Sequence, residues 1–350
     1  MLAPCLEDIE RRIDPDEDNR LRNAWVEFIE GRFTGSIFSP KRDRPRPPRF
    51  AWPEVRINDT LEDFKKMALR ELAAASRTLA AGSGTLLNVR ANYGTGILPS
   101  IFGAELFRMD DALDTLPTTR PLEGSADAIR ALLDCGAPEI TAGLGGRALE
   151  TSARFVQTFA PYPNLRRYLH VYHPDLQGPI DVCEMLWGSE IFLALVDEPE
   201  LVKALLELVT GTYLRFMCEW ERLVPPPADG FSRHWGLLHR GRIMLRDDSA
   251  MNLSPAMFDE FARPYDQRLL DEFGGGCLHF CGRGDHFIAS ACQMRSLHGI
   301  QLSQPECNDM EAIYRATVDR GIPLLGLRRE AAGEALGCGR DLRGLVHCRT

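Results

Sequence analysis

From residue 85 onward the sequence alternates short apolar runs with longer amphipathic segments, and this alternation constrains the fold more than any other feature. Short apolar runs are typical of buried strands, and helical periodicity between them is typical of β/α units around a parallel sheet. Seven such strands, most followed by a helix, come close to the eight of a (β/α)8 TIM barrel, and the missing strand is expected within residues 110–145. The candidate strands are residues 85–91, 166–172, 230–236, 277–281, 299–303, 322–327 and 344–348.

The first 82 residues predict an N-terminal helical extension that packs on an α/β barrel formed by residues 83–350. Apolar residues at helical spacing predict helices over 16–32 and 59–81, joined by the proline-rich residues 40–50. The arginines in that connection suit either an extended solvated linker or an arm for an anionic ligand. Within the barrel the clearest helices are expected at 199–222 and 254–273, since Pro199 and Pro255 occupy their first turns.

The composition excludes several classes of protein. A net charge of −9 argues against a nucleic-acid binder, because phosphate neutralisation needs a clustered basic surface. No run of about 18 apolar residues predicts a membrane span, and the N-terminus lacks the pattern of a secretory signal. Ten cysteines without dense regular spacing indicate reduced thiols. We therefore expect a cytoplasmic protein that binds neither nucleic acid nor membrane, and the sequence is compatible with a homodimer.

The stretch "CLHFCGRGDHF" (277–287) holds the best candidate metal site. Alternate side chains of a strand point to the same face, so His279 and Cys281 should project together. Gly282 and Gly284 follow, and Asp285 is expected to cap a helix. In a barrel this end of the strand lies at the mouth where catalytic groups gather. Imidazole and thiolate are donors that zinc accepts, although a buried His beside a buried Cys is the commoner explanation of such a pair.

A zinc site needs a third ligand, which should come from another strand end. Cys348 ends a later apolar run and is the first choice, and Cys307, in a loop after a proline, is the second.

Other polar residues near the expected barrel mouth are candidates for catalysis or substrate binding. Asp175 and Gln177 follow a strand and precede Gly-Pro, where they could contact substrate or stabilise the turn. Glu184 falls in an apolar helix start, where it could act as a base or support a ligand, or lie on the surface. The segment 233–255 carries both signs of charge ahead of a capped helix and suits a polar substrate, although solvated charges would look the same. The predicted catalytic residues are Asp175, Glu184 and Asp247, and the predicted substrate-binding residues are Gln177, His234, His239, Arg240 and Asp248.

Three longer stretches carry a family resemblance. "DLQGPIDVCEMLWG" (175–188), "DEPELVKALLELVT" (197–210) and "MNLSPAMFDEFARPYDQRLLDEFGGGCLHFCG" (251–282) resemble the uroporphyrinogen decarboxylase superfamily, over at least residues 85–327. Within it, His279-x-Cys281-Gly282 is similar to the signature of the zinc-dependent corrinoid methyltransferases. The resemblance implies a (β/α)8 barrel with its site at the carboxyl ends of the strands. It also implies zinc held by the His, the Cys and a further Cys nearer the C-terminus.

The same resemblance implies an activity. Such enzymes move a methyl group between a corrinoid carrier protein and a small thiol, and the zinc stabilises the thiolate. The corrinoid would arrive on a separate partner protein, since no segment of this chain resembles a cobalamin-binding domain. The arginine-rich N-terminal motif by which the decarboxylases grip porphyrinogen carboxylates has no equivalent here, which disfavours porphyrinogen as substrate. Two alternatives stay open: a metal-free decarboxylase of a smaller carboxylated substrate, using Asp175 with Asp247 or Asp248 as acid and base, and a non-catalytic barrel that acts as a binding partner.

Overall fold

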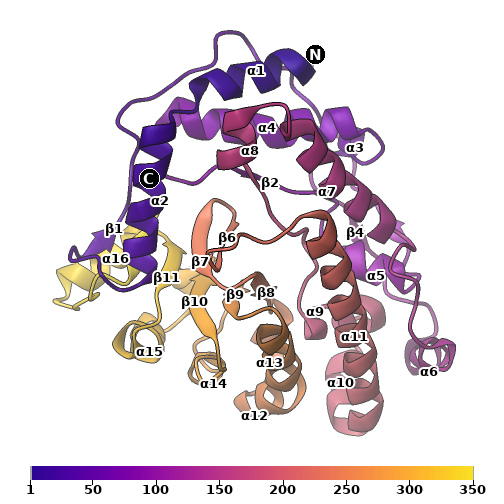
Figure 1. Ribbon diagram of the computed structural model, residues 1–350. Helices are drawn as coiled ribbons and strands as arrows, with labels where there is room; N and C mark the ends of the chain where they lie inside the picture. The colour runs from indigo at the N-terminus through magenta and orange to yellow at the C-terminus, as the bar shows by residue number, and fades with distance from the viewer. Residues whose placement is uncertain (1, 350) are drawn as a thin grey trace.

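The computed structural model describes residues 2–349, and a six-stranded parallel sheet lies at its centre (Figure 1). Its strand order is β1-β12-β11-β10-β9-β8. A separate parallel pair joins β2 to β5, and β3 pairs antiparallel with β4. The fold is therefore mixed α/β, with strands that alternate with helices from β8 onward. The sheet strands are β1 (Ile37–Phe38), β8 (Ile243–Arg246), β9 (Gly276–Phe280), β10 (Leu297–Leu302), β11 (Leu324–Leu327) and β12 (Val346–Cys348), and the paired strands are β2 (Asn88–Val89), β3 (Leu106–Phe107), β4 (Thr118–Thr119) and β5 (His170–Val171).

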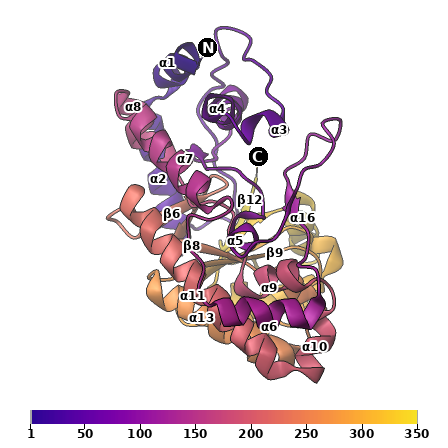
Figure 2. The ribbon, with the colours of Figure 1, turned by 90° about the vertical axis from the view of Figure 1, so that its right-hand side faces the viewer.

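Helices surround these strands (Figures 1 and 2). Before β5 they are α1 (Leu2–Arg12), α2 (Pro15–Ile29), α3 (Ile57–Thr60), α4 (Phe64–Ala81), α5 (Ile97–Ile101), α6 (Ser125–Cys135), α7 (Gly145–Phe159) and α8 (Pro163–Tyr168). After β5 they are α9 (Pro179–Trp187), α10 (Ile191–Asp197), α11 (Pro199–Leu223), α12 (Pro255–Met257), α13 (Arg263–Glu272), α14 (Ile288–Ala291), α15 (Met310–Ala316) and α16 (Arg329–Gly337). Within residues 2–349, none of the helices has the length and apolar character needed to cross a bilayer.

An antiparallel hairpin, β6 (Phe231–His234) and β7 (Leu237–Arg240), stands between the large sheet and the β2–β5 pair (Figure 1). Its two-residue turn consists of Trp235 and Gly236, both with positive φ, as a type I′ hairpin turn requires. The carbonyl of Gly236 accepts the N–H of Leu86, which ties the turn to the segment before β2. The hairpin thus fills the space that faces the inner side of the sheet.

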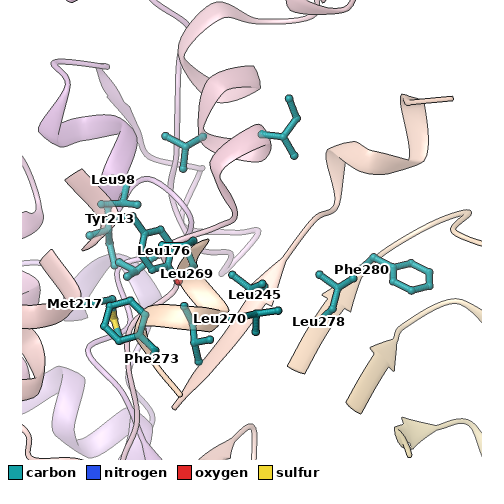
Figure 3. Close-up of a cluster of buried hydrophobic side chains, with 14 of the residues drawn as sticks. Leu98, Leu176, Tyr213, Met217, Leu245, Leu269, Leu270, Phe273, Leu278 and Phe280 are labelled. Atoms are coloured by element: carbon teal, nitrogen blue, oxygen red, sulfur yellow. The ribbon is translucent and has the colours of Figure 1, made fainter. Parts of the chain in front are cut away.

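The period of two along the strands sorts the core into two clusters. Leu245 and Leu278 belong to the larger cluster, with the covering helices, and Figure 3 shows them on neighbouring strands. Their chain neighbours Met244 and Cys277 belong to a smaller cluster with the hairpin and α2. The two faces of the sheet are therefore distinct: one faces the helices and the other, here called the inner face, meets the hairpin.

The N-terminal residues are part of this core. Ile37 and Phe38 in β1 pair in parallel with Val346 and His347 in β12, and the rings of Trp25 and Phe38 pack against His347. Residues 1–82, expected to form a helical extension on a larger body, thus contribute helices and an edge strand of the sheet itself.

Several predicted elements differ from the structure. Residues 166–168 end helix α8, so only His170 and Val171 of the predicted strand 166–172 are extended. The predicted strand 230–236 forms half of the hairpin, and β8 directly after it was not predicted. The missing strand expected within 110–145 corresponds only to β4, which is antiparallel. Asp285 does not cap a helix as predicted, because it pairs with Arg283 and accepts the N–H of Asp309. The helices 16–32, 59–81, 199–222 and 254–273 are present with shifted bounds or a break.

Candidate metal centre

The carboxyl ends of β8, β9 and β10 place a set of polar side chains on the inner face. Arg246, His279 and Gln301 are register partners on these three strands, so their side chains point the same way. Asp248 and Cys281 follow two residues later on their chains and continue the same alternation. The sequence therefore builds two successive polar layers above the apolar layer of Met244 and Cys277.

Asp248, His279 and Cys281 form the one cluster of potential metal ligands found among the described residues. Their ligand atoms all lie within 4.8 Å of one another. The Nε2 of His279 is 3.4 Å from the Sγ of Cys281 and 3.5 Å from the Oδ1 of Asp248. Zinc bonds of ~2.0 Å to nitrogen and oxygen and ~2.3 Å to sulfur, at a tetrahedral angle, would separate these donors by roughly 3.3–3.5 Å. The donor set fits one zinc ion with a fourth position open.

The imidazole of His279 is oriented for this role. Its Nδ1 hydrogen-bonds the side-chain oxygen of Gln301, so Nδ1 carries the proton and the lone pair of Nε2 faces Cys281 and Asp248. Burial lowers the pKa of His279 despite the neighbouring Asp248 carboxylate, which keeps the ring neutral, as metal binding requires. Burial also raises the pKa of Cys281 to about 11. A divalent cation would stabilise its thiolate.

Backbone amides fix the acidic side of the cluster. The Oδ1 of Asp248 accepts the N–H of Cys281 at 2.7 Å, which ties the loop after β8 to that after β9. Asp181 at the start of α9 accepts the N–H groups of Asp248 and Ser249 at 3.0 and 2.7 Å. The Asp248 side chain is 38% exposed, so the cluster opens toward solvent on this side.

A charged group lies beside the cluster. The Asp175 carboxylate is 3.1 Å from the Nε of Arg246 and 3.2 Å from the Nη1 of Arg90, and it accepts the Gln177 side-chain amide at 2.7 Å. Burial alone would raise the pKa of Asp175, but Arg246 and Arg90 together lower it to about 2. Asp175 is therefore ionised and orients the two arginines, and such a low pKa does not suit the acid–base role predicted for it.

The hairpin turn forms one wall of this site. The Trp235 ring lies 5.0 Å from the His279 ring and 5.0 Å from the Arg246 guanidinium. A cavity of about 390 Å³ opens next to it, lined by Trp235, Arg90, Tyr172 and Arg349 among others. A small substrate in this cavity would meet an aromatic surface and two cations.

Asp247, predicted as catalytic, lies on the other face of the sheet. Because strand side chains alternate, Arg246 points inward and Asp247 points toward α13, where its carboxyl contacts that of Asp266. Burial raises the pKa of both groups, that of Asp266 to about 7, so a proton is held between them. The prediction that Asp247 acts on substrate does not agree with this position.

The predicted substrate-binding residues of the hairpin also lie elsewhere. His234 and His239 are buried within it, and the Nδ1 of His234 is 2.6 Å from the Nε2 of His239. His239 donates its Nδ1 proton to the Arg240 carbonyl at 3.0 Å, so its Nε2 accepts from His234. Arg240 lies at the outer base of the hairpin and pairs with Glu30. These side chains stabilise the hairpin away from the metal ligands.

Cys348 is not part of the metal cluster. It is buried in the cluster that faces the helices, whereas its neighbour His347 packs against Trp25 on the inner side. The alternation of side chains therefore turns its sulfur away from His279, and Asp248 takes the place predicted for it. The second choice, Cys307, is exposed and lies outside the cluster too.

Glu184, predicted as catalytic, accepts a hydrogen bond from the Ser249 hydroxyl. Because Ser249 follows Asp248, this bond stabilises the loop that carries Asp248.

Arg90, Arg246, Gln301 and Trp235 shape the site and were not predicted. Arg90 lies in a predicted strand, and its position at a carboxyl end was the available signal. Gln301 also lies in a predicted strand, residues 299–303, although it was not singled out. Arg246 and Trp235 gave no signal, because β8 and the hairpin turn were not recognised.

Comparison of the sequence with models of known protein families finds no match, and comparison with curated proteins finds none either.

Proposed function

We propose that the chain is a zinc-dependent methyltransferase built on a (β/α)8 barrel of the uroporphyrinogen decarboxylase type. It would move a methyl group between a corrinoid on a separate carrier protein and a small thiol. The observation that carries the proposal is the Asp248–His279–Cys281 cluster, with one oxygen, one nitrogen and one sulfur donor at the carboxyl ends of neighbouring strands.

The strand arrangement supports the barrel. The six strands of the sheet and the β2–β5 pair are eight strands, each parallel to its partner. Contacts lie at both gaps between them. Lys41 after β1 forms an isolated antiparallel bridge with Ser83 before β2, while Gly178 after β5 donates its N–H to the Arg246 carbonyl of β8 at 2.7 Å. In such a barrel β1 from the N-terminal residues would be one of the eight strands, and the hairpin would fill the interior.

The residues of the site suit thiol chemistry. Bound zinc would act as a Lewis acid that lowers the pKa of a substrate thiol and so supplies a thiolate nucleophile. Gln301 holds the His279 ring in the ligating orientation, and the Cys281 amide holds Asp248. Trp235 covers the cluster from the hairpin side and limits the access of water. The exposed side of Asp248 leaves room for a carrier protein to approach.

The test is metal analysis of the purified protein with three ligand variants and a matched control. The wild type is expected to hold one zinc per chain. Asp248→Asn, His279→Ala and Cys281→Ser should each weaken zinc binding by at least about tenfold, because each removes one of three ligands. Cys348→Ser removes a buried thiol on the other face and should leave zinc content unchanged. A folded wild-type protein that binds no zinc, or loss of zinc in Cys348→Ser alone, would contradict the proposed site.

Activity is tested separately with methylcobalamin as donor and a small thiol as acceptor. The zinc-loaded protein should demethylate the cobalamin, and the loss of the methyl group is followed by the change in its visible spectrum. Zinc binding without methyl transfer to any of a panel of thiols would refute the methyltransferase and retain the metal site.

One observation favours a second function, the decarboxylation of a small carboxylated substrate. The Nη2 of Arg246 is buried and has no hydrogen-bond partner in the part of the chain that the structure describes, and a carboxylate is the group that it would bind best. Release of carbon dioxide by metal-free protein, lost in Arg246→Met, would establish this alternative. A non-catalytic binding barrel predicts that His279→Ala and Cys281→Ser leave partner binding intact.

A further inference from the structure

A second cavity lies along one face of the hairpin. Its volume is about 690 Å³, within the range of small-molecule sites. The hairpin turn contacts His279, whereas Phe231, Arg233 and Leu238, which share one face of the hairpin between its turn and its base, line this cavity. Four residues of strand from Phe231 to Trp235 span roughly 13 Å. The cavity extends along this face toward the base of the hairpin, where α2, α7 and α8 meet β6 (Figures 1 and 2), and none of Asp248, His279 and Cys281 lines it.

The wall of this cavity is strongly cationic. Four arginines line it, and one acidic residue, Asp229, faces them and pairs with Arg22. Among the described residues, Arg166, Arg167 and Arg233 make no ion pair with a carboxylate. Three guanidinium groups without a carboxylate partner thus surround one cavity in a chain whose net charge is −9.

Of the three arginines, Arg233 gives the strongest argument for a bound anion. It is partly buried, and one of its nitrogens donates to the carbonyl of Tyr168 at 3.2 Å. Burial, together with the positive charge of Arg22, lowers the pKa of Arg233 to about 10, although Asp18 and Asp229 act in the opposite direction. A guanidinium held in this way is electrostatically unfavourable, and an anion in the cavity would relieve it.

Most of the remaining lining is apolar, apart from Asn19, Tyr168 and His170. Phe159, Leu169, Val171, Val224 and Phe231 line the same cavity as the arginines. A ligand that matches both parts combines a multiply charged anionic group with an apolar body. Guanidinium groups bind phosphate through paired, charge-assisted hydrogen bonds, and three of them favour a dianion over a single carboxylate.

We propose that this cavity binds a phosphorylated small molecule with an apolar body, at a site separate from the metal centre. The phosphate would contact Arg166, Arg167 and Arg233, and the apolar body would pack against Phe159 and Phe231. The site does not depend on zinc or on the proposed methyl transfer.

The probe is 1-naphthyl phosphate, measured by isothermal titration calorimetry on the full chain. It should bind saturably and at least about tenfold more tightly than inorganic phosphate or 1-naphthol, because each fragment satisfies only half of the lining. Equal binding of 1-naphthol would refute the anion site, and equal binding of inorganic phosphate would refute the apolar half. Absence of saturable binding of the probe would overturn the proposal.

Variants locate the site. Arg166 and Arg167 are exposed, so the double variant Arg166→Gln/Arg167→Gln should fold, and it is expected to weaken the probe's binding by at least about tenfold. The double variant Arg44→Gln/Arg295→Gln removes the same charge from exposed positions outside the cavity and should bind like the wild type. Equal weakening in both double variants would show a non-specific charge effect and overturn the proposal. Zinc content, measured in parallel, should not change in either.

Discussion

The proton shared by Asp247 and Asp266 predicts an unusual dependence of stability on pH. Both carboxyls are buried behind β8, and within residues 2–349 neither has a further hydrogen-bond partner. Burial raises the pKa of Asp266 from 3.8 to about 7, which corresponds to ~4 kcal/mol at 1.36 kcal/mol per pKa unit. The folded state binds this proton more tightly than the unfolded chain. The stabilisation is therefore complete below pH about 4 and is lost as the pH rises through about 7.

The perturbation is Asp266→Asn, which keeps the shape of the side chain and cannot ionise. Its amide can donate to the Asp247 carboxylate at every pH, so the part of the pH-dependent loss that comes from Asp266 should disappear. Relative to the wild type, the variant should gain ~4 kcal/mol in free energy of unfolding between pH 4 and pH 8. Asp247→Asn/Asp266→Asn removes both titrating groups and should show no remaining slope from this pair.

Urea denaturation at half-unit steps of pH, followed by tryptophan fluorescence, measures the difference. Asp271→Asn is the matched control, since Asp271 lies on the same helix α13 but is 45% exposed and pairs with Arg295. Its difference from the wild type should stay within about 0.5 kcal/mol across the range. If Asp266→Asn differs from the wild type by the same amount at pH 5 and at pH 8, no proton is shared and the reasoning fails.

Two further predictions concern contacts of Arg246 at the end of β8: the packing of Gly178 against its carbonyl, and the ion pair of Asp175 with its side chain. A Cβ on Gly178 would lie 2.4 Å from the Arg246 carbonyl oxygen, so Gly178→Ala should lower the free energy of unfolding by about 2 kcal/mol or more. Gly333→Ala in α16 meets nothing within 4 Å and should be neutral or slightly stabilising in the same denaturation assay. Asp175→Asn should cost about 3 kcal/mol at pH 7, because it leaves Arg246 and Arg90 buried without their carboxylate. Since the folded pKa of Asp175 is about 2, this difference should vanish toward pH 2 in acid titrations, and a constant difference would refute the ion-pair account.

Part of the site could be predicted because a local rule sufficed. His279 and Cys281 are two residues apart on an apolar run, so their side chains had to lie on the same face of the strand. The structure places the Nε2 of His279 3.4 Å from the Sγ of Cys281. The same rule could not choose a face for Cys348. That choice depends on which side of β12 meets the helices. The alternation shows that Cys348 and His347 face opposite ways, but it does not show which of them faces inward.

The hairpin explains why the other residues of the site could not be placed from the sequence. A type I′ turn usually carries Asn or Gly at its first central position, and here Trp235 occupies it with φ 49°. Without a turn signal, residues 230–236 resembled one more parallel strand, and β8 directly after it resembled a charged loop. The positions of Arg246 and Asp248 at a strand end were hidden with it. Tertiary packing of Trp235 against His279 and Arg246 stabilises a turn that local preference does not favour.

The pairing of β1 with β12 has a consequence for how the chain acquires its structure during synthesis. The Ser39 hydroxyl donates to the Cys348 carbonyl across 309 positions of sequence, so the ribosome must add all the residues between them before β1 finds its partner. Until residues 346–348 emerge, Trp25 and Phe38 lack the ring of His347 against which they pack. Closing such a long loop is slow, and the waiting aromatic surface is exposed to chaperones and to aggregation. The environment of Trp25 therefore reports whether β12 has joined β1.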